Sequence, residues 1–127
     1  MNALWTRILL GLLLAAGLSD GRTPGQDDSK TIKIVSSLPR TGSAKAQTDT
    51  IVNGIQMALE EAGWKAGAFT IKYEDLDDAT ASEGKWTAEK EAANAEQAIK
   101  DPDVMVYIGT YNSGAAKISI PILNQKD

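Results

Sequence analysis

The feature that most constrains the fold is a repeated alternation between short β-branched or apolar runs and longer stretches with helical periodicity. The order strand, helix, strand, helix, strand, helix with short connections implies right-handed crossovers and a parallel sheet covered by helices. We therefore predict an α/β fold in which the chain forms a partial doubly wound parallel sheet. The predicted strands are Thr31–Val35, Phe69–Tyr73 and Met105–Ile108, and the predicted helices span about 46–62, about 85–100 and the residues from near Ser113.

The spacing of apolar residues indicates which face of each predicted element is buried. In the first two helices apolar residues recur every three or four positions, as on the buried stripe of an amphipathic helix. The third strand is apolar throughout, so we expect it to be buried on both faces. The predicted stripes are Ile51, Ile55, Leu59 and Ala62 in the first helix, and Ala88, Ala92, Ala95 and Ile99 in the second.

The N-terminus has the pattern of a secretory signal peptide. Arg7 precedes an apolar run over 8–18, and small residues near its end allow cleavage after either Gly17 or Ser19. We predict a signal peptide over residues 1–19, a flexible tether over 20–30 rich in Gly, Asp and Ser, and a periplasmic or other extracytoplasmic location. The segment Leu14–Gly17 approaches a lipoprotein cleavage site, but no Cys follows it, so no lipid anchor is expected.

Composition excludes several classes of function. Thirteen Lys and Arg against 17 Asp and Glu give a formal charge of -4 with no basic block, so nucleic acid is not an expected partner. The chain has no Cys and no His, which removes thiol nucleophiles, the commonest zinc ligands and any Ser-His-Asp triad. We expect a protein that is not an enzyme and holds no metal or cofactor.

Two loops follow predicted strands and are the candidate ligand sites, because ligands of open parallel sheets bind at the carboxyl ends of the strands. A helix that begins near Ser113 presents unpaired backbone N–H groups to a carboxylate, and the serine hydroxyl can donate to that anion. Ser113 can also be a plain helix cap. Tyr111 and Asn112 either wall a pocket or lie on the loop surface. The two loops are Leu38–Gln47 and Gly109–Ser113.

Three other segments have weaker functional readings. The loop Thr41–Lys45 opens a helix but matches neither glycine-rich nucleotide motif. In the acidic loop Glu74–Asp78, the cluster of Asp75, Asp77 and Asp78 with Glu83 favours a solvated loop over a calcium site, because the EF-hand glycine and bidentate glutamate are missing. Lys85-Trp86 is expected to anchor the second helix by packing the indole against the core.

The chain resembles the branched-chain amino acid binding proteins, the extracytoplasmic receptors of ABC importers. The resemblance covers Thr31 to about Lys126, and its most specific part is the turn after the third strand followed by IPIL. The residues that carry it are IKIVSSLPRTG, IVNGIQMALEEAG, YEDLDDA and GKWTAEKEAANAEQAIKDPDVMVYIGTYNSGAAKISIPILN.

The resemblance implies the fold of a type 1 periplasmic binding protein, with residues 31–127 as an incomplete N-terminal lobe. In that family a serine in this turn holds the ligand's α-carboxylate and α-ammonium groups. Carried over, Ser113 matches that serine, Tyr111 and Asn112 lie beside it, and the first loop contributes Thr41, Gly42 and Ser43. The second lobe, which supplies the acidic partner of the ammonium group, is not in this sequence.

The resemblance also implies partners and leaves alternatives open. It implies a monomer that binds a small amino acid or amide between two lobes and presents the closed form to an ABC permease. A ligand-sensing ectodomain built on the same fold is the alternative. A secreted hydrolase would need catalytic groups from outside this chain.

Overall fold

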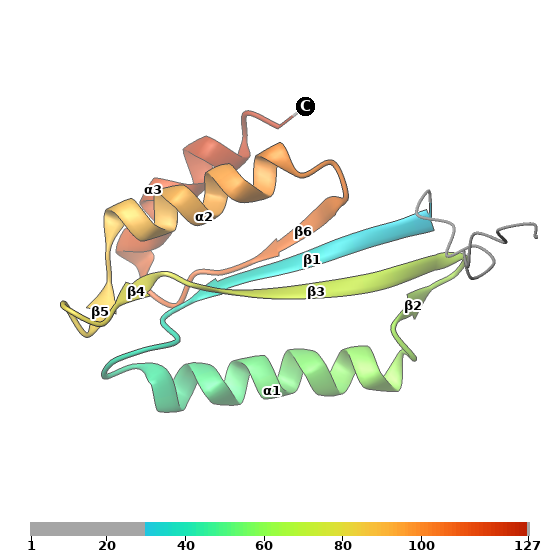
Figure 1. Cartoon of the computed structure of the whole chain (residues 1–127), viewed down its shortest axis with the longest axis horizontal. Helices are drawn as coiled ribbons and strands as arrows, with labels where there is room; N and C mark the ends of the chain where they lie inside the picture. The colour runs from blue at the N-terminus through green and yellow to red at the C-terminus, as the bar shows by residue number, and fades with distance from the viewer. Residues whose placement is uncertain (1–29, 127) are drawn as a thin grey trace, which may run out of the picture.

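The computed structural model describes residues 30–126, which form a sheet with helices on both faces (Figure 1). The predicted signal peptide and residues 20–29 of the predicted tether lie outside this range. α1 (Lys45–Glu61) covers one face, whereas α2 (Ala88–Lys100) and α3 (Ser113–Leu123) lie over the other. No helix in the described range is both long and apolar enough to cross a membrane.

The sheet has the order β2-β3-β1-β6, and β1 lies parallel to both of its neighbours. This parallel core confirms the predicted α/β class. The short β2 pairs antiparallel with β3, and a separate small hairpin is formed by β4 and β5. The strands are β1 (Thr31–Leu38), β2 (Lys65–Ala66), β3 (Phe69–Asp77), β4 (Ala79–Thr80), β5 (Lys85–Trp86) and β6 (Val104–Ile108).

The first two main strands run further than predicted. β1 continues through Ser36 and Ser37, whose side chains are fully buried, because each hydroxyl finds a partner inside the fold. The Ser36 hydroxyl lies 2.7 Å from the hydroxyl of Tyr73 and donates to Asp75 at 2.9 Å. The segment Glu74–Asp77, predicted as a solvated loop, is therefore the second half of β3, paired in register with β1.

The prediction that the third strand is buried on both faces is wrong for the described chain. β6 lies at the edge of the sheet, and the side chains of Met105 and Val106 are 64% and 43% exposed. Val104 is buried in a small core with Val35 and Ala98, and Tyr107 of the same strand packs against this core.

The two predicted helix stripes are confirmed at Leu59 and Ala95 and are wrong at Ile51, Ala62 and Ala88, which are exposed. In α1 the buried residues are Thr48, Val52 and Leu59, whereas Ile51 is exposed. The hydroxyl of Thr48 donates to the Pro39 carbonyl at 2.5 Å, which turns this polar residue toward the sheet. In α2 the buried residues are Glu91, Asn94, Ala95 and Ala98, and the predicted Ala88 is exposed.

The second helix begins three residues later than predicted, because Thr87 caps it. The Thr87 hydroxyl accepts from the backbone N–H of Lys90 at 3.3 Å, and the two residues before Thr87 belong to β5. The segment expected to anchor α2 is thus a strand of the small hairpin.

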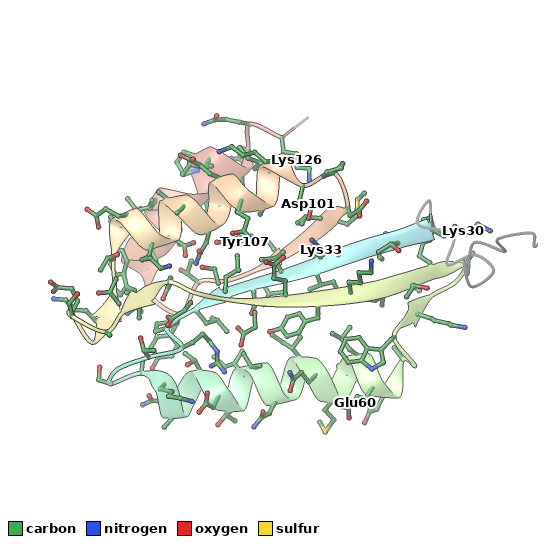
Figure 2. All side chains as sticks on the ribbon, viewed as in Figure 1. Lys30, Lys33, Glu60, Asp101, Tyr107 and Lys126 are labelled. Carbon is green, nitrogen blue, oxygen red and sulfur yellow. The ribbon has the colours of Figure 1, made fainter. Side chains whose placement is uncertain are left out.

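The end of the sheet where α2 turns into β6 is held by charged side chains (Figure 2). Lys33 of β1 forms an ion pair with Asp101 at the end of α2. The Lys126 ammonium group donates to the carbonyls of Asp101 and Val104 at 2.7 and 2.8 Å. These contacts lie far from the small hairpin, which sits at the opposite end of the sheet (Figure 1).

Candidate functional site

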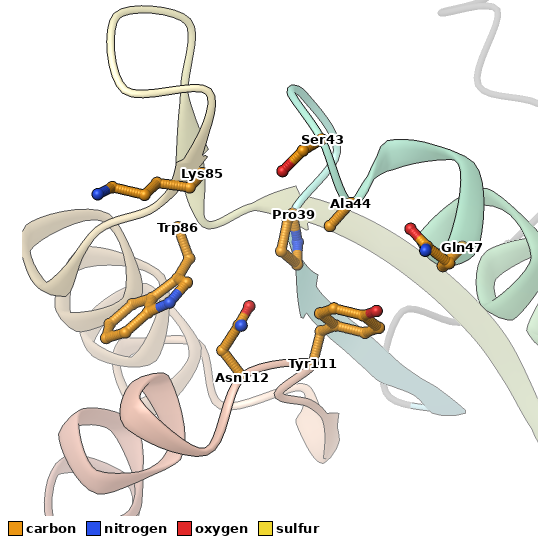
Figure 3. Close-up of a pocket in the computed structure, with 8 residues that line it drawn as sticks. All are labelled: Pro39, Ser43, Ala44, Gln47, Lys85, Trp86, Tyr111 and Asn112. Atoms are coloured by element: carbon orange, nitrogen blue, oxygen red, sulfur yellow. The ribbon is translucent and has the colours of Figure 1, made fainter.

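A cleft of about 310 Å³ opens where the loops after β1 and β6 meet the β4–β5 hairpin (Figure 3). Its position outside the carboxyl ends of β1 and β6 is where ligands of open parallel sheets bind. Its walls combine two aromatic rings with polar groups. The cleft is lined by Pro39, Ser43, Ala44 and Gln47 from the first loop and α1, by Lys85 and Trp86 from β5, and by Tyr111 and Asn112 from the loop before α3.

The structure brings together half of the predicted site residues. Ser43, Tyr111 and Asn112 line the cleft, as expected for two loops that meet at one edge of the sheet. Thr41, Gly42 and Ser113 do not line it. The ligand roles of all six stay predictions, and the geometry separates the three that face the cleft from the three beside it.

Ser113 begins α3 instead of capping it. Asn112 is the N-cap residue by its extended backbone, and its side chain makes no capping hydrogen bond. Within the described range, the first helical N–H groups with an acceptor are those of Ala115 and Ala116, which both donate to the Asn112 carbonyl. The N–H groups of Ser113 and Gly114 therefore stay free beside the cleft, where they can donate hydrogen bonds to an anion.

Gly42 allows the first loop to pack closely against the β4–β5 hairpin. Its φ is +78°, and a Cβ built there would lie 1.9 Å from the carbonyl oxygen of Gly84. The next residue, Ser43, donates its N–H to that same carbonyl at 3.1 Å. The first loop thus rests directly on the tip of the β4–β5 hairpin, and only glycine permits this approach.

Arg40 also fixes the first loop, because it binds acidic residues of α1 and β3. Asp75 and Asp77 of β3 therefore already have partners. The guanidinium group donates to Asp75 at 2.8 Å and pairs with Asp49 of α1 at 2.9 Å. Asp77 accepts the backbone N–H groups of Arg40 and Ala79 at 2.7 and 2.8 Å. These carboxylates tie β1, α1 and β3 together, and the described residues contain no group of three or more candidate metal ligands.

Trp86 lines the cleft, although its sequence context predicts only a packing role against the core. It pairs with Ala79 in the hairpin, and its ring lies against the first turn of α3, since a Cβ at Gly114 would be 2.6 Å from the indole Cζ2. The signal that could have located it is the run Gly84-Lys-Trp-Thr87, in which a glycine with positive φ closes a tight hairpin and a threonine starts a helix.

A buried polar cluster joins α2 to β1 and β6. Glu91 is fully buried and accepts hydrogen bonds from the hydroxyls of Ser37 at 2.5 Å and Tyr107 at 3.0 Å. The Tyr107 hydroxyl has its pKa raised by burial and by the nearby Glu91 carboxylate. Asn94 donates to Ser37 at 2.9 Å and completes this link between α2, β1 and β6.

Asp78 adjoins this cluster without a partner for its side chain. Both carboxyl oxygens are buried, and neither has a hydrogen-bond partner in the structure. Burial, reinforced by the charges of Glu91 and Asp77, raises the pKa of Asp78 to about 7. Its backbone joins three elements, since its N–H donates to Leu38 and its carbonyl accepts from Thr87.

Comparison with known proteins supports the binding-protein fold. No protein-family profile and no curated protein matches the chain. Among solved structures, the leucine-binding protein LivK from Thermotoga maritima matches with a TM-score of 0.63 and 26% identity. The match covers 75% of this chain and 25% of LivK, so the chain spans about a quarter of that protein's length. The α/β architecture described above is thus that of part of one lobe of a type 1 periplasmic binding protein.

Proposed function

We propose that this chain is part of an extracytoplasmic solute-binding receptor that binds a small amino acid or amide in the cleft beside Ser113. The observation that carries the proposal is the pair of free N–H groups of Ser113 and Gly114 at the start of α3, next to the cleft. A helix N-terminus with unpaired N–H groups is suited to the α-carboxylate of an amino acid. The similarity to a leucine-binding protein supports an amino acid as the ligand.

The other walls of the cleft offer both polar groups and apolar surface to the remaining parts of an amino acid, its amino group and its side chain. Asn112 and Ser43 offer hydrogen-bonding groups at its mouth, while Trp86 and Tyr111 offer apolar surface (Figure 3). A cleft of about 310 Å³ lies at the lower end of the volumes of small-molecule sites. As in two-lobed receptors, a second lobe would close over the ligand and the closed form would be presented to an ABC permease.

Titration of the ¹⁵N-labelled chain with single amino acids and their amides tests the proposal. With only one wall of the cleft present we expect weak binding, with Kd values on the order of 1 mM. A ligand should shift the backbone amide resonances of Ser113 and Gly114, and resonances at the far end of α1, such as that of Glu60, should stay in place.

A matched ligand pair isolates the carboxylate. Leucine should move the two amides more than isoamylamine, which has the same side chain and amine but lacks the carboxylate. If neither amino acids nor amides at about 10 mM shift these resonances, the proposed function is wrong.

A further inference from the structure

The apolar part of the cleft wall consists of aromatic rings. Of the described residues that line the cleft, none is Leu, Ile, Val or Met. The carbon surface comes from Trp86 and Tyr111, with smaller contributions from Pro39 and Ala44. A site shaped for a branched aliphatic side chain would be expected to place aliphatic groups around it, and this wall does not.

The Trp86 ring is held in place before any ligand arrives. The β4–β5 pairing fixes its backbone opposite Ala79, and contact with Gly114 fixes the edge of its indole. The Ser43 N–H donates to Gly84 at the tip of the same hairpin, so the hairpin is tied to the first loop as well. Preorganised aromatic surface binds a ligand without the entropic loss of ordering a mobile side chain.

Tyr111 supplies a second ring from a different element. Its side chain is 43% exposed, although it is a large aromatic group, and it lies across Asn112 from Trp86 (Figure 3). Both rings border the same opening. The free N–H groups of Ser113 and Gly114 follow directly after Tyr111 and Asn112 in the chain. A ligand whose carboxylate reaches these groups therefore has aromatic surface within reach of its side chain.

We propose that the preferred ligand is an amino acid with a planar aromatic side chain, and that Trp86 of the β4–β5 hairpin determines this specificity. The inference rests on the proposed function, because it uses the same cleft. Aromatic rings attract each other beyond the burial of area when they stack with an offset or meet edge to face. A saturated side chain of the same size gains the burial alone, so the two kinds of ligand can be told apart.

The test compares L-phenylalanine with L-cyclohexylalanine, which differ in planarity and π electrons and little in size. In the full ¹⁵N-labelled chain, phenylalanine should bind about 2- to 10-fold more tightly, the range expected of an aromatic pair. It should also shift the indole Nε1–H resonance of Trp86. That resonance is assigned by its disappearance in Trp86→Leu.

The Trp86→Leu variant should lose most of the preference for phenylalanine over cyclohexylalanine. The matched control is Trp64→Leu, the same exchange at the residue before β2, at the other end of the sheet. This control should keep the preference. The comparison of the two ligands on the unaltered chain needs no variant, so a Trp86→Leu chain that fails to fold does not block the test.

The outcomes separate this inference from the proposed function. If amino acids shift the Ser113 and Gly114 amides but cyclohexylalanine or leucine binds as tightly as phenylalanine, the aromatic specificity is wrong and the receptor function stands. The same holds if the Trp86 indole resonance stays fixed while those amides move. If no amino acid moves them, the aromatic specificity is wrong, and if amino acid amides do not move them either, the proposed function is wrong as well.

Discussion

The indole ring of Trp86 lies against Gly114 so closely that a Cβ at position 114 would stand 2.6 Å from Cζ2 and 2.9 Å from Cη2. This contact joins the β4–β5 hairpin to the first turn of α3. The absence of a side chain at Gly114 thereby allows one wall of the cleft to lie close to the free N–H groups of α3. A methyl group at this position cannot be accommodated unless the indole or the helix moves.

We therefore expect Gly114→Ala to lower the free energy of unfolding by about 1–3 kcal/mol, the usual effect of overpacking. This loss should appear although alanine is the better helix former. Gly54→Ala in α1 is the control, since a Cβ there meets nothing within 4 Å. It should stabilise the chain by about 0.5–1 kcal/mol. Urea unfolding of both variants measures the difference, and equal stabilisation by both would contradict the packing seen at Gly114.

The main frame of the fold could be predicted from the sequence because it depends on periodicity. The sequence pattern predicts three strands and three helices in alternation, and all six are present in the structure, although their bounds and buried faces differ in part. The burial of Ser37, Glu91 and Asn94 could not be predicted in this way, because a periodicity argument assigns polar residues to the surface. Their burial depends on partners distant in sequence, such as the Ser37 hydroxyl that donates to Glu91.

The sequence predicts the part of the cleft that is formed by loops following strands of the parallel sheet, and it does not predict the part formed by the β4–β5 hairpin. The loops after β1 and β6 are both candidate ligand sites by their position at the carboxyl ends of strands, and Ser43 of the first shares the cleft with Tyr111 and Asn112 of the second. The contribution of Trp86 was missed, because β4 and β5 are two residues long and leave no alternation to detect. Their position is set by tertiary contacts, chiefly that of Gly42 with Gly84.

The contact between Gly42 and Gly84 gives a second prediction. Gly42→Ala adds a Cβ 1.9 Å from the Gly84 carbonyl oxygen at a backbone φ of +78°, so the loop and the hairpin must separate. Gly63→Ala is the matched control, because Gly63 has a φ of +62° and nothing within 4 Å of its Cβ. The control should lose about 1 kcal/mol from backbone strain alone.

Gly42→Ala should lose clearly more stability than the control and should also shift the Trp86 indole resonance. Thermal unfolding and the NMR spectrum of tryptophan side chains measure the two effects. Equal destabilisation by both variants would show that the first loop does not rest on the hairpin.

Export of the chain is a third prediction, which tests the N-terminal segment and the extracytoplasmic location together. Expressed in a bacterial host, the chain should be recovered from the periplasm lacking its first 17 or 19 residues, and the intact mass decides between the two sites. Leu12→Arg places a charge in the apolar run and should abolish export. Gln26→Arg, beyond the predicted cleavage sites, should leave export unchanged. Recovery of the uncleaved chain from the cytoplasm would contradict the prediction.

The stability of the chain should depend on pH through Asp78. Its pKa is raised from 3.8 in the unfolded chain to about 7 in the folded one by burial and by the charges of Glu91 and Asp77. Between about pH 4 and pH 7 the unfolded chain therefore releases this proton while the folded chain keeps it, and the free energy of unfolding falls as pH rises. Above about pH 7 both states are ionised and the contribution levels off. A difference of three pKa units corresponds to roughly 4 kcal/mol.

Replacement of Asp78 by asparagine isolates this titration from that of other carboxyl groups. Asp101, whose pKa is lowered chiefly by its hydrogen bond with Lys33, acts in the opposite direction, since its contribution is lost as pH falls below about 4. At pH 8 Asp78→Asn should therefore be more stable than the unaltered chain, because it removes a buried charge that has no hydrogen-bond partner. At pH 4.5 the two chains should differ little, since Asp78 is then protonated in the fold and already nearly as neutral as asparagine. Urea unfolding at the two pH values measures the effect, and a constant difference between the chains would show that Asp78 is ionised throughout this range.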